Sequence, residues 1–231
     1  MRAEIRTRAG PSSSDGLEGL HFYIITATIT LIAFIAYFVM ATGNGVSSLA
    51  ASGDTVREFY WARYIGWLFT TPLLLLDLAL LALVRPGRST GLIAGIIGLD
   101  VGMILTGLGA GASSNAFLRV VLFLISTAAF IGVVYFLVTR LLAAARSQTA
   151  EVARVFDILA GLTIVLWTLY PVVFLLGTEG FGALGISTEV FAFMVLDLLA
   201  KVGFGFLFLT NRDAIASVSG GSSSQTAARV S

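Results

Sequence analysis

Residues Phe193 to Leu209 have the sequence FMVLDLLAKVGFGFLFL, a strongly apolar run with an aspartate and a lysine at its centre. Charged side chains at membrane depth cost about 2.5–3.5 kcal/mol each on insertion scales, so their presence needs a reason. Asp197 and Lys201 are four residues apart, which places both on one face of a helix. Two interpretations stay open at this point. The pair either lowers the cost of insertion only, or is a Schiff-base-forming amine beside its counterion.

The composition of the whole chain is that of a membrane protein. Of 231 residues, 57% are hydrophobic and 12% are charged, whereas a soluble domain carries about 25% charged residues. The charges cluster between apolar runs of about 20 residues, the length of a spanning helix. No alternating pattern indicates barrel strands. We therefore predict an all-α transmembrane helix bundle with spans at residues 21–41, 62–84, 91–110, 118–140, 155–177 and 187–210.

The arginines predict the orientation of this bundle in the cell membrane. They precede the first span, fill the second and fourth loops, and follow the last span. The positive-inside rule then places both termini in the cytoplasm. The polar, Ser- and Gly-rich composition of the ends is typical of disorder. We expect a disordered cytoplasmic segment at residues 1–20, a multi-pass bundle at 21–213 and a disordered cytoplasmic tail at 214–231.

Several function classes are disfavoured by what the sequence lacks. There is no cysteine and only one histidine, so neither a thiolate or imidazole metal site nor a histidine-based catalytic triad is expected. The net charge of +1 does not suggest a nucleic-acid partner. These features favour a protein that is not an enzyme and whose main surroundings are the lipid bilayer.

The second span carries a narrow polar stripe. Arg63, Gly66, Thr70 and Asp77 recur at helical spacing, and the stripe is about 21 Å long at 1.5 Å per residue. Such a stripe on a lipid-bounded helix is expected to face the bundle interior. It is compatible with an ion or proton path interrupted at Gly66, and equally with a packing stripe in which Asp77 is protonated and hydrogen-bonded.

Aromatic residues share one face of the fifth span. Trp167, Tyr170 and Phe174 lie at this spacing beside Pro171, which is expected to kink the helix. Aromatic residues at such a spacing more often form plain core than a ligand site. They would line a slot for a flat ligand together with two side chains of the fourth span, Phe123 and Phe130.

Longer stretches resemble the microbial rhodopsin family. WARYIGWLFTTPLLLLDLALL, from Trp61 to Leu81, is similar to the third helix of bacteriorhodopsin-type proteins. VLWTLYPVVFLLGTEG, from Val165 to Gly180, resembles their sixth helix, and Phe193 to Leu209 resembles their retinal-binding last helix. Shorter segments resemble the fourth, fifth and second helices: Gly98–Ala110, Leu124–Phe130 and His21–Phe38. The resemblance covers about residues 21–213.

The resemblance implies all-trans retinal bound as a Schiff base to Lys201, with Asp197 as its counterion. It also implies that Arg63 is a gated charge, that Asp77 is a cytoplasmic proton donor and that Glu179 and Glu189 form an extracellular release pair. Tyr37 and Tyr170 are expected to donate hydrogen bonds to Asp197. The resemblance places the remaining pocket residues on or near the polyene: Trp67, Thr71, Asp100, Met103, Ser126, Trp167, Tyr170 and Phe174.

Two departures from the family pattern affect the expected function. The family carries an acidic proton acceptor at the position of Gly66, and it has seven helices where this sequence predicts six spans. The first helix of the family has no counterpart here. We expect lipid, contacts in a homo-oligomer such as a trimer, or a further segment to cover the face that it would occupy.

Three functions are compatible with these features. The first is light-driven proton transport in which Asp197 or water replaces the usual acceptor, and Asp77, Glu179 and Glu189 favour it. The second is light-driven anion transport, with chloride held between Gly66, Thr70 and Arg63. The third is a sensory rhodopsin without ion pumping. Proton transport is the preferred prediction.

Overall fold

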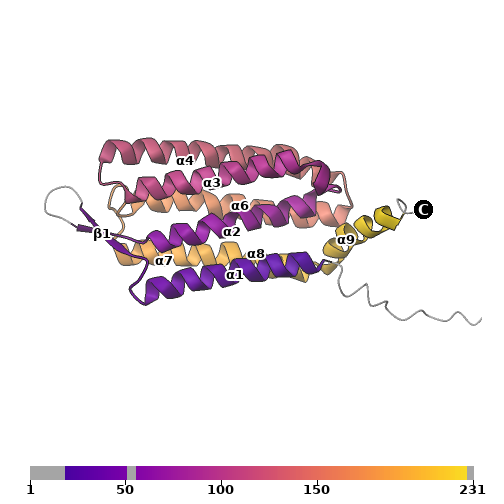
Figure 1. The fold of residues 1–231 in the computed structure, drawn as a ribbon, viewed down its shortest axis with the longest axis horizontal. Coiled ribbons are helices and arrows are strands. Elements are labelled where there is room, and N and C mark those ends of the chain that lie inside the picture. Colours follow the sequence, from indigo (N-terminus) through magenta and orange to yellow (C-terminus); the bar gives the residue numbers. More distant parts are fainter. Residues whose placement is uncertain (1–18, 51–55, 228–231) are drawn as a thin grey trace, which may run out of the picture.

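The computed structural model describes residues 19–50 and 56–227. Within these residues, six helical segments are long and apolar enough to cross a membrane, which confirms the predicted spans. They lie side by side in one bundle (Figure 1). The first three are α1 (Leu20–Ala41), α2 (Trp61–Ala82) and α3 (Thr90–Ala112). The others are α4 (Ala116–Phe136), α6 (Ala150–Leu176) and α7 (Ile186–Asp197), and α4 and α7 each continue into further helical segments.

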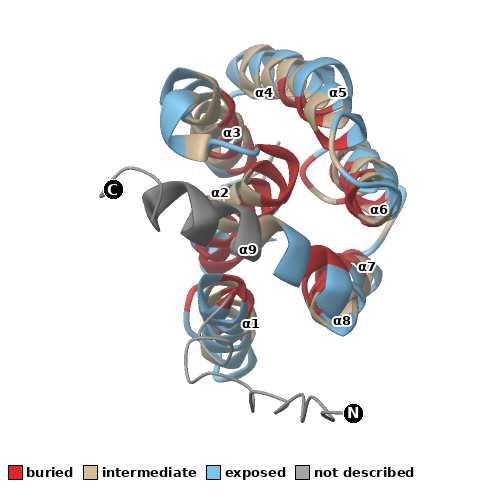
Figure 2. Cartoon of the chain, turned by 90° about the vertical axis from the view of Figure 1, so that its right-hand side faces the viewer, coloured by how far each residue is buried: buried red, intermediate tan, exposed pale blue. Residues whose placement is uncertain are grey.

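Helix α2 forms the centre of the bundle. In its most apolar window 61% of the residues are buried, against no more than 39% in any other described span. Figure 2 shows buried residues around most of α2 and along the inward faces of its neighbours. Large apolar side chains such as Phe34, Leu124 and Phe206 point outward and are exposed. In a membrane those side chains contact lipid tails, so the bundle is apolar both inside and outside.

Short polar side chains fix two of the helix starts. The carboxamide of Asn115 accepts a hydrogen bond from the Leu118 amide (3.0 Å) and caps α4. The hydroxyl of Thr149 accepts one from Val152 (3.3 Å) and caps α6. At the end of the bundle where α6 begins, the Gln148 carboxamide donates to the carbonyls of Leu81 (2.9 Å) and Ala82 (2.7 Å), which lie in the last turn of α2.

A small hairpin, absent from the sequence-based prediction, closes the opposite end. Strand β1 (Ser47–Ala50) pairs antiparallel with β2 (Val56–Phe59) between α1 and α2. Side chains of a strand alternate between faces. Arg57 and Phe59 are accordingly buried against the bundle, while Val56 and Glu58 are exposed.

Two of the long helices contain a wide π-helical turn. One spans Leu137–Leu141 between α4 and α5 (Leu142–Arg146). The other spans Leu198–Gly203 between α7 and α8 (Phe204–Thr210), and it contains Lys201. Such turns are rare and occur often at functional sites. Hydrophobic spacing alone did not predict either of them.

The C-terminal segment differs from the expected disordered tail at 214–231. Helix α9 covers Arg212–Ala227, and residues 228–231 lie outside the described residues. The first turn of α9 is held by apolar contacts, because Ala214 and Ile215 are buried in the main core cluster. Composition gave no sign of this buried contact, and the disorder expected for the tail stays a prediction. The expected disordered segment at 1–20 lies outside the described residues except for its last two positions.

Candidate functional site

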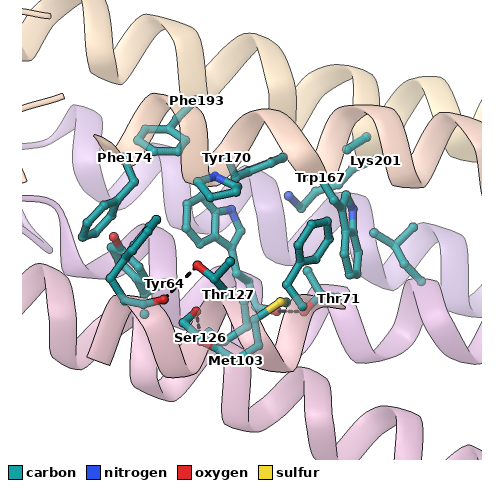
Figure 3. Close-up of a pocket in the computed structure, with 18 residues that line it drawn as sticks. Tyr64, Thr71, Met103, Ser126, Thr127, Trp167, Tyr170, Phe174, Phe193 and Lys201 are labelled. Atoms are coloured by element: carbon teal, nitrogen blue, oxygen red, sulfur yellow. Dashed lines mark hydrogen bonds between the residues drawn. The ribbon is translucent and has the colours of Figure 1, made fainter. Parts of the chain in front are cut away.

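An apolar cavity lies in the middle of the bundle beside Lys201. Figure 3 shows the Lys201 side chain reaching toward the space bordered by Trp167 and Tyr170. Helices α2, α3, α4 and α6 and the last transmembrane helix all contribute to the wall, which is mostly aromatic and aliphatic. Its lining residues are Tyr64, Trp67, Thr71, Leu74, Met103, Ile104, Gly107, Phe123, Ser126, Thr127, Phe130, Trp167, Tyr170, Pro171, Phe174, Phe193, Ala200 and Lys201.

A buried ion pair closes one side of this cavity. The ammonium of Lys201 contacts the carboxylate of Asp197, and both side chains are at most 4% exposed. Tyr37 donates a hydrogen bond to Asp197 Oδ2 (2.6 Å), Tyr170 donates to Oδ1 (2.8 Å), and the indole of Trp67 donates at 3.0 Å. The expected hydrogen bonds of both tyrosines are confirmed. A buried carboxylate held in this way is fixed in orientation and balances the charge of the amine.

The sequence predicted much of the cavity wall. All the expected pocket residues line it except Asp197, which contacts Lys201, and Asp100, which contacts the wall through Thr71. It missed Leu74, Ile104, Gly107, Thr127 and Ala200, and also the two aromatic residues Tyr64 and Phe193. Helical spacing offered a signal for both, since Tyr64 precedes Trp67 by three residues and Phe193 precedes Asp197 by four.

The stripe on α2 faces the bundle interior as predicted. Arg63, Gly66, Thr70 and Asp77 are all buried. Asp77 accepts a hydrogen bond from the Thr26 hydroxyl on α1 (3.3 Å). Asp77 Oδ1 and Thr70 Oγ1 have no hydrogen-bond partner among the described residues. Buried polar atoms are seldom left unpaired, so these two indicate places for a proton, a water molecule or a ligand.

A second buried charge cluster lies at the hairpin end of the bundle. Arg63 Nη2 is 3.4 Å from Glu189 and 3.8 Å from Glu179, and its guanidinium lies 3.9 Å from the ring centre of Phe193. Tyr64 donates a hydrogen bond to Glu179 (3.4 Å). Glu189 accepts from the amide and hydroxyl of Thr178 at 2.7 and 2.8 Å. Thus the two predicted release carboxylates and Arg63 lie together.

Burial sets the proton affinity of Glu179, which lies in the loop between α6 and α7. It raises the pKa of this carboxyl from 4.5 to about 7, against the opposing attraction of Arg63. Glu189 adds a negative charge and acts in the same direction as burial. At neutral pH the group is therefore close to the balance between its charged and neutral forms.

Comparison with known proteins gives concordant matches. A family model described as "Bacteriorhodopsin-like protein" matches residues 12–215. Bacteriorhodopsin of Haloterrigena sp. (strain arg-4) is 53% identical over 195 residues, 84% of this chain and 76% of that protein. The crystal structure of thermophilic rhodopsin from Rubrobacter xylanophilus is 60% identical, with a TM-score of 0.84, and the match covers 88% of this chain and 87% of that one. The light-driven proton pump LR (Mac) from Leptosphaeria maculans is 39% identical, with a TM-score of 0.75 and coverage of 83% and 82%.

Proposed function

This chain belongs to the bacteriorhodopsin-like family, whose members bind retinal through a Schiff base to a lysine, and from that premise we propose that it moves protons across the cell membrane in response to light. Its similarity to a solved light-driven proton pump supports this proposal. In it, Lys201 binds retinal, Asp197 is the counterion, and Gly66 stands where the family carries the proton acceptor.

The residues present suit retinal. Lys201 reaches an apolar, largely aromatic cavity, and Asp197 supplies the negative charge that a protonated nitrogen at Lys201 requires. When bound, retinal supplies a polyene that absorbs light and isomerises. Trp67 and Trp167 border the cavity and restrict the orientation of a flat ligand. The apolar lining keeps bulk water away from the nitrogen.

The observation that carries the proposal is the arrangement of buried polar groups along α2 on both sides of the cavity. Toward the hairpin end, Arg63 contacts Glu179 and Glu189. Toward the other end, Asp77 is fully buried beside Thr26. A neutral Asp77 carries its proton at a carboxyl oxygen and can supply it toward Lys201. The Glu179–Glu189 cluster can receive a proton and deliver it to the surface at the hairpin end.

The step between Lys201 and that cluster differs from the family pattern. With glycine at position 66, α2 offers no carboxyl group between Arg63 and Thr70. Asp197 is the carboxylate in contact with Lys201. We propose that Asp197, alone or through water, takes the proton, while Tyr37 and Tyr170 keep its oxygens in place.

A light-induced pH measurement tests the proposal. Illuminated cells or vesicles containing the retinal-loaded protein in unbuffered medium are expected to give a pH change that a protonophore abolishes. Lys201→Ala is expected to give neither pigment nor pH change. Asp77→Asn is expected to slow the recovery after a flash while keeping the pigment. A coloured wild-type protein without any protonophore-sensitive pH change would contradict proton transport.

The role of Gly66 is tested by restoring a carboxylate. In Gly66→Asp the added negative charge near Lys201 is expected to shift the retinal absorption to shorter wavelength and to enlarge the pH change. A Cβ at position 66 meets the Cβ of Ala36 at 3.0 Å, so a small local adjustment is needed. The double variant with Ala36→Gly removes this contact. If both variants keep the wild-type absorption and transport, position 66 does not control the proton step.

Anion transport is the second candidate, and a specific observation favours it. Thr70 Oγ1 and Arg63 Nε are buried without a hydrogen-bond partner among the described residues, and they flank Gly66 on one face of α2. A chloride ion would find two donors there. Titration with chloride against sulfate is then expected to shift the absorption of the wild-type protein and to leave Thr70→Val unchanged. An unchanged wild-type spectrum would exclude this site.

A further inference from the structure

Arg57 is a buried cation carried by the hairpin and not by a transmembrane helix. Alternation along β2 turns Arg57 toward the bundle beside Phe59, and its side chain is only 7% exposed. Arginine is seldom buried to this extent unless its charge is compensated. Neither the polar stripe of α2 nor the retinal cavity includes this residue.

One bond anchors the guanidinium of Arg57. Its Nη2 donates to the carbonyl of Gly111 (2.6 Å), in the last turn of α3, where carbonyl groups lack helical partners and carry partial negative charge. Its Nε and Nη1 are buried and have no partner among the described residues. The anchoring bond therefore leaves most of the hydrogen-bonding capacity and the full positive charge of the side chain available to its surroundings.

The anchor brings Arg57 close to Glu179. A Cβ at Gly111 would lie 3.1 Å from the hydroxyl oxygen of Tyr64, so the carbonyl-bearing residue packs against that tyrosine. The same hydroxyl donates to Glu179 Oε1. The other carboxyl oxygen, Oε2, has no partner among the described residues. Arg57 and Glu179 are thus connected through Gly111 and Tyr64, and each has unpaired buried polar atoms among the described residues.

We infer that Arg57 is a positioning residue for the extracellular proton step, a second guanidinium that stabilises the charged form of Glu179 and so sets the pH at which this carboxyl gives up its proton. This inference rests on the proposed function in giving Glu179 a role in proton release. The effect of the Arg57 charge on the protonation of Glu179 is a property of the protein in the dark, so it can be measured whether or not the protein transports protons. The hairpin then tunes the proton path as well as covering the bundle.

Other charged and titratable groups face Glu179 and define the background for this effect. Arg63 and Tyr64 approach it from α2, and Glu189 approaches from α7. Arg119, on α4, donates to the backbone carbonyl of Glu179 (3.2 Å) and not to its carboxylate. Arg63 and Arg57 both favour the charged carboxylate, against burial and Glu189. Loss of Arg57 leaves Arg63 as the cation in contact with it.

The test is an infrared titration of the retinal-loaded protein in the dark. The band of the protonated carboxyl of Glu179 is identified by its absence in Glu179→Gln, and its pH midpoint is compared between variants. Arg57→Gln and Arg57→Met are both expected to raise the midpoint by about one pH unit, because a nearby positive charge is lost. Arg57→Lys, which keeps the charge, is expected to return the midpoint toward that of the wild type. The retinal absorption band shows that each variant is folded.

Glu58→Gln is the matched control. Glu58 is the next residue of β2, but it is exposed and its carboxylate contacts Tyr60. Its removal changes the hairpin charge by the same amount and is expected to leave the midpoint unchanged, since exposed charges are screened. The inference is overturned if Arg57→Gln or Arg57→Met leaves the midpoint in place, if Arg57→Lys shifts it as far as the neutral variants do, or if Glu58→Gln has an effect of equal size.

Discussion

Glu179 couples the stability of the protein to pH. Its pKa in the folded protein, about 7, exceeds the ordinary value of 4.5, so the folded state binds this proton more tightly than the unfolded chain does. The resulting stabilisation is fully present below about pH 4.5 and is lost as the pH rises through about 7. Glu179→Gln is expected to flatten this part of the profile of thermal bleaching midpoint against pH. A variant that keeps the full wild-type slope would contradict the prediction.

The hydrogen bond between Thr71 and Asp100 is expected to contribute to the stability of the cavity wall. Thr71 donates to Asp100 Oδ2 at 2.8 Å, and Oδ1 has no partner among the described residues. Thr71→Val leaves a buried carboxyl without its donor, which costs about 1–3 kcal/mol. The thermal midpoint of pigment loss is expected to fall. Thr168→Val is the control, because that hydroxyl is exposed and bonds only its own helix. Equal effects of the two changes would contradict this assignment.

At the residue scale, the sequence pointed to charged residues inside an apolar span and missed aromatic residues that lie in the core. Asp197 and Lys201 stood out because charge is rare within an apolar run. Tyr64 and Phe193 are uncharged, and their helical spacing alone did not distinguish them from the aromatic residues that are common in any core. Arg57 was missed for another reason. It lies a few residues before the second span, where the sequence alone suggests an exposed loop residue. Its burial follows from its place in the hairpin, which the sequence did not predict.

Gln148 is expected to hold two elements together. It donates to the carbonyls of Leu81 and Ala82, which are among the last carbonyls of α2 and lack helical partners. Gln148→Ala removes both bonds and is expected to cost about 1–2 kcal/mol of stability. Hydrogen exchange at the end of α2 is expected to rise with it. Ser147→Ala is the control, because the Ser147 hydroxyl bonds only the local carbonyl of Ala144. Unchanged exchange in Gln148→Ala would contradict the prediction.

At the element scale, hydrophobic length predicted the spans well and local geometry poorly. The predicted span at 118–140 ends where α4 passes into its π-helical turn, while helical structure continues through α5 to Arg146. The π-helical turn around Lys201 leaves no mark in residue spacing. The hairpin escaped detection because its strands are four residues each, too short for a reliable alternating pattern.

The orientation of the whole molecule stays a prediction, and the absence of cysteine makes it simple to test. Single cysteines at Ser48, on the hairpin, and at Ser147, between α5 and α6, occupy exposed positions at opposite ends of the bundle. A membrane-impermeant maleimide added to intact cells is expected to label Ser48→Cys and to leave Ser147→Cys unlabelled until the cells are opened. The reverse pattern would place the hairpin in the cytoplasm.

The contact between Gly19 and Ile215 brings together the two places where the chain enters and leaves the bundle. A Cβ at Gly19 would lie only 2.5 Å from the Ile215 side chain. Because these two places are in contact, the helices could be joined in a different order along the chain and still pack in the same arrangement. A short linker across this contact, with new termini opened in the turn at Ser113, would give a circularly permuted chain with the same bundle. Such a permutant would let α1, the hairpin, α2 and α3 be synthesised after α4 and α6 instead of before them.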